Sequence, residues 1–276
     1  MASKENTDRL LQGIANTLTV YGYHVIDNSL FYGKGGIVMY LYAYAAYSGD
    51  EAYEDFAGDM LDIVMADTKK MKSDFDRGFT GIGWLLDWLI KRGYVEGDVN
   101  DVLKAYDKAM FARIECEKES DLALQTLYLT ERLEHVTKDY DITPLAGIFL
   151  RILAQRLEKK DMNRFQALSV EKLITKTKVM HLNEKDKESI KKLKNKIRKE
   201  VEKNRQKEDM VKNNPLCYST SDLIETVFLP TGIKFELSEE QINFIIENYI
   251  KNAEPTSLHL FGGLAGLGVI LLENYC

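Results

Sequence analysis

The sequence predicts an all-α protein in which six helix pairs, each with an outer and an inner helix, close into an (α/α)6 toroid. Two observations predict this fold: a glycine pattern that recurs along the chain, and an alternation between two kinds of helix. Alternation of apolar and polar residues with period two, which would indicate strands, is scarce.

The glycine pattern stands directly ahead of long apolar segments. In GFTGIGWLLDWL, residues 78–89, and in GLAGLGVILL, residues 263–272, the glycines follow one another at intervals of three and then two residues. GKGGIVMYL, from residue 33, is a third copy with Val38 in the last glycine position. Glycine costs about 0.5–1 kcal/mol relative to alanine inside a helix, so this pattern indicates a tight helix entry or a close backbone approach.

The three copies fit one period of about 46 residues, which suits a helical hairpin repeated around an axis. Segments near residues 122, 168 and 217 fill the remaining steps of this period, although their glycines are absent. We therefore expect the inner helices to begin near Leu30, Arg77, Asp121, Phe165, Cys217 and Phe261.

The segments between these starts are amphipathic, with a single apolar stripe. A helix that is apolar all round is buried, whereas a striped helix faces water on its other side, so outer and inner helices alternate. We expect one closed domain over residues 1–276, because an open solenoid would need a polar capping repeat at its end. The stripes are Leu11, Ile14 and Leu18; Leu103, Tyr106, Met110 and Ile114; Leu145, Ile148, Phe149 and Ile152; Ile190, Leu193, Ile197 and Val201; and Ile242, Ile245, Ile246 and Tyr249.

Composition and charge limit the partners and the cellular location that the protein is expected to have. The net charge of −6 argues against nucleic acid, and carboxylates interleave the lysine-rich stretch from Lys185 to Lys207, which predicts a solvated outer helix. IVMYLYAYAAY, the longest apolar run, is too short to span a membrane, and MASKENTDRL lacks the apolar core of a signal peptide. Cys116, Cys217 and Cys276 have no paired spacing, so we expect no disulfide framework and a cytoplasmic location.

The repeated glycine pattern followed by an apolar helix resembles the lanthionine synthetase C-like family. The best copy is FDRGFTGIGWLLDWLIKRGYVEGD, residues 75–98, and the last is SLHLFGGLAGLGVILLENY, residues 257–275. The resemblance implies an α/α toroid whose glycine-rich turns ring one mouth of the barrel. Cyclases of this family hold a zinc ion that activates a cysteine thiol of a precursor peptide for addition to a dehydrated Ser or Thr.

The resemblance also implies where zinc ligands should stand: one Cys in a WCxG-like motif, and a Cys-His pair in a CHG motif, each at the opening of an inner helix. LCYS matches the first motif through Cys217, but Phe261 and Gly262 occupy the positions of the Cys-His pair. A catalytic zinc needs about three protein ligands, so two of the three are missing. We expect no cofactor, with Cys217, alone or paired with His259, as a weak candidate for zinc.

Residues at the openings of the inner helices are the candidate ligand-binding residues. Helix N-termini present unpaired N–H groups and a partial positive charge, which favour anionic or hydrogen-bond-accepting ligands. The candidates are Lys34, Asp76, Arg77, Tyr218 and His259, with Lys34 and Arg77 as contacts for anions or carboxylates; for catalysis they are Cys217, His259 and Asp76.

The incomplete zinc set favours a protein that binds a precursor peptide or a partner protein in the toroid mouth, without complete cyclase chemistry. Whether the protein is an enzyme stays open. One alternative is a thioether-forming cyclase with an altered metal site, and another uses Cys217 as a nucleophile with His259 as its base. A third is a glycosidase-like (α/α)6 enzyme that uses the rim carboxylates of Asp74 and Asp76.

The remaining Asp and His residues of interest are expected to have no role in binding or catalysis. Asp87 lies between Trp84 and Trp88 on an inner helix and is expected to be a buried hydrogen-bonding residue. His24, His135 and His181 fall at other phases of the repeat, without partners at helical spacing, so they do not form a ligand set.

Overall fold

The computed structural model describes residues 3–118, 120–158, 160–177, 183–205, 216, 218–230, 232 and 234–274. Within these ranges the chain forms twelve α-helices with short 3-10 and π-helical segments, and it forms no strand. The predictions of an all-α protein and of twelve helices are confirmed.

The helices predicted as inner are the even-numbered ones, and each begins within a few residues of its expected start. Glycine or a capping side chain precedes most of them: Gly33, Asp121, Asn163 and Gly263 are N-caps. The even-numbered helices are α2 (Lys34–Ser48), α4 (Phe79–Lys91), α6 (Leu122–Arg132), α8 (Arg164–Lys176), α10 (Thr220–Leu223) and α12 (Leu264–Glu273).

The helices predicted as outer are the odd-numbered ones. They are α1 (Lys4–Tyr21), α3 (Glu51–Asp67), α5 (Val99–Arg113), α7 (Thr143–Leu157), α9 (Glu184–Arg205) and α11 (Glu239–Ile245). Three of the helices predicted as inner are buried as expected, whereas α8 is not, because it exposes Glu171 and Lys176. In α2, α4 and α12 all residues of 34–45, 79–89 and 264–272 are buried, whereas α1 buries one face that includes Leu10, Leu11, Ile14 and Leu18.

The predicted stripe of α7 is wrong in phase. Ile148 is 38% exposed, and the buried face instead consists of Ala146, Phe149, Leu150 and Leu153. Apolar residues fill more than one face of this helix, so several stripes fit the sequence equally well.

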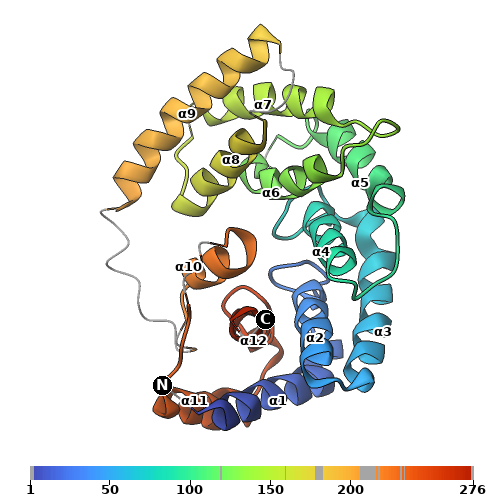
Figure 1. Cartoon of the computed structure of the whole chain (residues 1–276), viewed down its shortest axis with the longest axis vertical. Coiled ribbons are helices and arrows are strands. Elements are labelled where there is room, and N and C mark those ends of the chain that lie inside the picture. Colours follow the sequence, from blue (N-terminus) through green and yellow to red (C-terminus); the bar gives the residue numbers. More distant parts are fainter. Residues whose placement is uncertain are drawn as a thin grey trace. The chain divides into compact units, whose positions relative to one another are not determined.

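The contacts divide the chain into two compact units, which are described separately. The first comprises Met1–Met71, Lys91–Val95 and Val211–Cys276, and the second comprises Lys72–Ile90 and Glu96–Met210. The first unit thus holds helices from both ends of the chain, α1 to α3 and α10 to α12 (Figure 1). The single domain over residues 1–276 stays a prediction.

In the first unit, the last helix packs directly against the first inner helix. The contact between α12 and α2 depends on Gly268, because a Cβ there would lie 2.2 Å from the ring of Tyr40. The Tyr40 hydroxyl extends past α12 and donates to the backbone oxygen of Leu11 on α1, at 2.6 Å. Tyr40 therefore joins α12, α2 and α1.

In the second unit, a glycine of α4 meets a tyrosine of α6 in a similar way. A Cβ on Gly83 of α4 would lie 2.7 Å from the ring of Tyr128 on α6, and the Tyr128 hydroxyl donates to Asp107 on α5 at 2.6 Å. In both units a tyrosine fills the space beside a glycine of another even-numbered helix and bonds to the odd-numbered helix before its own. The contact of α12 with α2 thus repeats the contact between two successive helix pairs.

Candidate functional site

The turns before α2 and α4 close on themselves in the same way. The N–H of Lys34 donates to the oxygen of Asp27, and the N–H of Phe79 donates to the oxygen of Lys72, both at 2.9 Å. The turn before α12 has a similar bond, from Ala265 to Leu258 at 3.2 Å. Each turn therefore folds back over seven residues and delivers its side chains to the N-terminus of a buried helix.

The glycines at the ends of these turns leave no room for a side chain. A Cβ would lie 2.4 Å from the Asp27 oxygen at Gly33, 2.3 Å from the Lys72 oxygen at Gly78, and 2.3 Å from the His259 oxygen at Gly263. Backbone atoms cannot yield as a flexible side chain can, so the first glycine of the pattern is required by the closed turn.

Lys34 is buried at the start of α2. Its Nζ donates to the backbone oxygen of Val25. The pKa of its ammonium is lowered, because the effect of burial outweighs the opposing effect of the Asp27 charge. The ammonium is thus engaged by its own turn, and its predicted role as an anion contact stays a prediction.

An aromatic group lines the turns before α2 and α12. Phe31 stacks on Phe261 with ring centroids 5.0 Å apart and also meets Phe228 at 5.3 Å. Tyr32 meets His259 at 5.9 Å and Phe261 at 5.7 Å. Since Tyr32, His259 and Phe261 are only half-buried, this aromatic group presents a partly exposed edge at the two turns.

Tyr218 fastens the turn before α12 to the segment that leads into α10. It is buried, and its hydroxyl donates to the backbone oxygens of Gly263 at 2.9 Å and Leu260 at 3.2 Å. Burial raises the pKa of this hydroxyl. The neighbouring Cys217, the candidate nucleophile and metal ligand, lies outside the described residues.

Asp76 and Arg77 lie in the turn before α4, in the second unit. Asp76 is half-buried, and burial raises the pKa of its carboxyl although backbone N–H groups donate to it. Arg77 is exposed. Asp74 lies in the same turn and has a structural role, because its Oδ1 accepts a hydrogen bond from the backbone N–H of Asp121 at 3.2 Å.

Of the predicted site residues, the structure brings together those of the first unit. Lys34, Tyr218 and His259 belong to turns that contact one another, while Asp76 and Arg77 share one turn of the second unit. The grouping of all candidates around a common pocket stays a prediction.

The residues present do not fit the zinc ligand set that the family resemblance implies. The ring of Phe261 stacks on Phe31, and Gly262 has no side chain and a φ of 90° that disfavours other residues. Across the described ranges, no three His, Cys, Asp or Glu side chains are grouped to hold a metal ion. No helix of those ranges is both long and apolar enough to cross a lipid bilayer.

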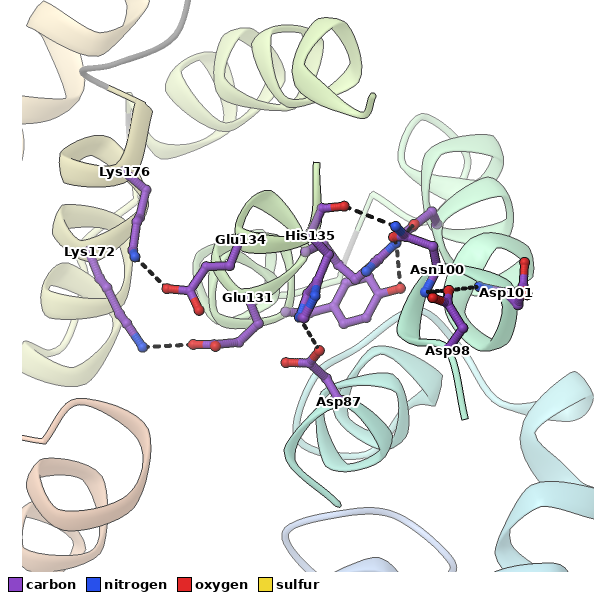
Figure 2. A network of polar contacts seen from close by, with 12 residues as sticks. Asp87, Asp98, Asn100, Asp101, Glu131, Glu134, His135, Lys172 and Lys176 are labelled. Carbon is purple, nitrogen blue, oxygen red and sulfur yellow. Dashed lines mark hydrogen bonds and ion pairs between the residues drawn. The ribbon is translucent and has the colours of Figure 1, made fainter. Parts of the chain in front are cut away.

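The sequence analysis missed a pair of polar residues in the second unit. Nε2 of His135 lies 2.7 Å from Oδ1 of the buried Asp87, and Asn100 donates to the backbone oxygen of His135 at 3.0 Å (Figure 2). Asp87 is buried, as expected, and the residue within ion-pair distance of it is a histidine that was not expected to have a partner. The two are far apart in the sequence, so no spacing could have indicated the pair.

Two ion pairs lie beside it and join α8 to the end of α6. Lys172 contacts Glu131 at 2.9 Å, and Lys176 contacts Glu134 (Figure 2). Lys172 and Lys176 are about one helical turn apart, and so are their partners Glu131 and Glu134. This arrangement ties two successive even-numbered helices together.

A network centred on the buried Asp107 and Arg132 links α5 and α6, with the half-buried Tyr140 at its edge. Asp107 accepts hydrogen bonds from the Arg132 guanidinium at 2.9 Å, from Tyr128 at 2.6 Å and from Tyr140 at 2.8 Å. Arg132 and Asp107 are almost completely shielded from solvent. With several structural partners around a buried Asp107, this network supports the fold rather than a ligand.

Comparison of the chain with models of protein families, with curated proteins and with solved structures finds no match. The family resemblance drawn from the glycine pattern therefore remains a proposal.

Proposed function

We propose that this protein is a lanthionine synthetase C-like (α/α)6 toroid that binds a precursor peptide or a partner protein at the mouth formed by its glycine-rich turns. In this proposal it acts in peptide modification as a binding protein, without complete zinc-dependent cyclase chemistry.

The observation that carries the proposal is the contact between α12 and α2. Gly268 and Tyr40 pair as Gly83 and Tyr128 do between successive helix pairs, so the last pair meets the first as a neighbour. A row of helix pairs whose ends meet in this way is expected to close into a ring, and an open solenoid is not.

The chemistry of the turns supports a peptide ligand. The partly exposed edge of Tyr32, His259 and Phe261 combines apolar area with polar ring atoms, which suits peptide side chains and backbone. Arg77 offers an exposed guanidinium that can bind a carboxylate in a bidentate manner. A binding role does not depend on the zinc ligands that Phe261 and Gly262 replace.

The test is a pull-down of cellular peptides and proteins with the wild type, followed by affinity measurement of the captured partner for Arg77→Ala and Tyr32→Ala. Lys108→Ala is the matched control, because Lys108 is an exposed cation on α5. We expect weaker binding by the first two variants only. A partner retained equally by all variants would remove the turns from the proposal.

A glycosidase-like activity is a second candidate, favoured by the raised pKa of Asp76. A general acid needs a carboxyl that stays protonated closer to neutral pH, and burial supplies that shift here. The other rim carboxylate, Asp74, is already engaged by a backbone N–H. Hydrolysis of a panel of oligosaccharides that is lost in Asp76→Asn would favour this candidate over peptide binding.

A further inference from the structure

A groove of about 550 Å³ lies between α7 and α9 in the second unit, away from the glycine-rich turns. Its volume falls within the range of about 300–1,000 Å³ that is typical of small-molecule sites. Its lining includes Arg151 of α7, Glu158 directly after that helix, and carboxylates and ammonium groups of α9.

Glu200 is the unusual member of this lining. It continues the buried stripe of α9 after Ile190, Leu193 and Ile197, where an apolar residue is expected, and it is only 7% exposed. Within the described part of the chain, its Oε2 is buried and accepts no hydrogen bond. A buried carboxylate without a donor is strongly unfavourable, so this position calls for a donor from elsewhere.

Asp186, at the other end of the same buried stripe, shows what a satisfied carboxylate looks like here. It is 4% exposed, and its Oδ1 lies 2.5 Å from Nη1 of Arg151 on α7. The stripe therefore tolerates a carboxylate when a cation faces it, and among the described side chains none forms an ion pair with Glu200.

The groove also contains ammonium groups, some of which have a partner among the described residues and some of which do not. Lys192 pairs with Glu188 at 3.1 Å, and Lys196 donates to the backbone oxygen of Glu158 at 3.4 Å. For Lys185 and Lys199 the described residues provide no ion pair. The groove thus combines a carboxylate whose buried Oε2 accepts no hydrogen bond with the ammonium group of the adjacent Lys199.

We propose that this groove binds a ligand that carries both an ammonium group and a carboxylate. The ammonium donates to Glu200, and the carboxylate accepts hydrogen bonds from Lys199, which is next to Glu200 on α9. An amino acid has this chemistry, and so does a peptide segment with one basic and one acidic side chain. The proposal is independent of ligand binding at the glycine-rich turns.

The test uses the full chain and three six-carbon probes: 6-aminohexanoate, hexanoate and hexylamine. Backbone amide shifts of α7 and α9 in NMR spectra report binding. We expect 6-aminohexanoate to bind at least about tenfold more tightly than either single-charge probe, as one charge-assisted hydrogen bond predicts. A capped tetrapeptide with one Lys and one Asp separates the two sources: tighter binding than 6-aminohexanoate assigns a peptide segment, and weaker binding a free small molecule.

The variant Glu200→Gln should lose this preference by about the same factor, while Glu188→Gln, an exposed control in the same groove, should retain it. Equal affinity for the three probes, or an unchanged preference in Glu200→Gln, would overturn the proposal. A urea midpoint that falls in Glu200→Gln would also overturn it, because the carboxylate would then have a structural partner.

Discussion

Gly83 and Gly268 share an environment that explains their place in the repeated pattern. Each lies against a tyrosine ring of another even-numbered helix, where a Cβ would come within 2.7 and 2.2 Å of ring atoms. The rings are held from behind by hydrogen bonds from Tyr128 to Asp107 and from Tyr40 to Leu11, so they cannot easily retreat. The entropy cost of glycine in these helices is thus offset by close packing.

Replacing Gly83 by alanine should therefore destabilise the protein by about 1–3 kcal/mol, the usual cost of overpacking a core. Gly58 on α3 is the matched control, because a Cβ there meets only the Tyr42 hydroxyl, at 3.5 Å. Gly58→Ala should be neutral or stabilise by about 0.5–1 kcal/mol. Urea unfolding measures both; a loss of stability in Gly58→Ala as large as that in Gly83→Ala would contradict this interpretation.

Tyr140 provides a pH test of the buried network around Asp107. Burial, together with its hydrogen bond to Asp107, raises the pKa of Tyr140 from 10.0 to about 12. Because the folded-state pKa is the higher one, the stabilisation is complete below pH 10 and is lost as the pH rises through about 12. The free energy of unfolding should fall more steeply over this window in the wild type than in Tyr140→Phe, and parallel curves would argue against it.

At the scale of helices, the sequence predicts which helices form, and in which order, better than it predicts which face of each helix is buried. The starts of α2, α4 and α12 follow from the glycine pattern, because the closed turn demands glycine at a fixed place, and the starts of α6, α8 and α10 follow from extending the period. The phase of α7 does not follow, because its apolar residues fill several faces and only its neighbours select one. No feature of the sequence indicates the pair of Asp87 and His135, because only the packing of the helices brings these two residues together.

The observed phase of α7 makes a prediction of its own. Phe149 is fully buried, so Phe149→Ala should cost about 3–5 kcal/mol, whereas Ile148, 38% exposed, should tolerate Ile148→Ala with a loss below about 1 kcal/mol. Urea unfolding of the two variants measures the difference. Equal losses, or a larger loss in Ile148→Ala, would restore the phase expected from the sequence.

At the scale of the whole molecule, we propose that the chain closes on itself. The first unit holds helices from both ends of the chain, and its contact between α12 and α2 repeats the contact between α4 and α6 in the second unit. A closed ring would place the glycine-rich turns around one mouth, which is the setting that the proposed peptide binding requires.

A double-mutant cycle between Gly268 and Tyr40 tests this claim most directly. Gly268→Ala should destabilise the wild type by about 1–3 kcal/mol through overlap with the Tyr40 ring, and much less in a Tyr40→Leu background that removes the ring. The predicted result of urea unfolding is a coupling above about 1 kcal/mol for this pair, while Gly268 and Tyr128 remain additive. Additivity of Gly268 and Tyr40 within about 0.5 kcal/mol would show that α12 and α2 do not meet and would contradict the closed ring.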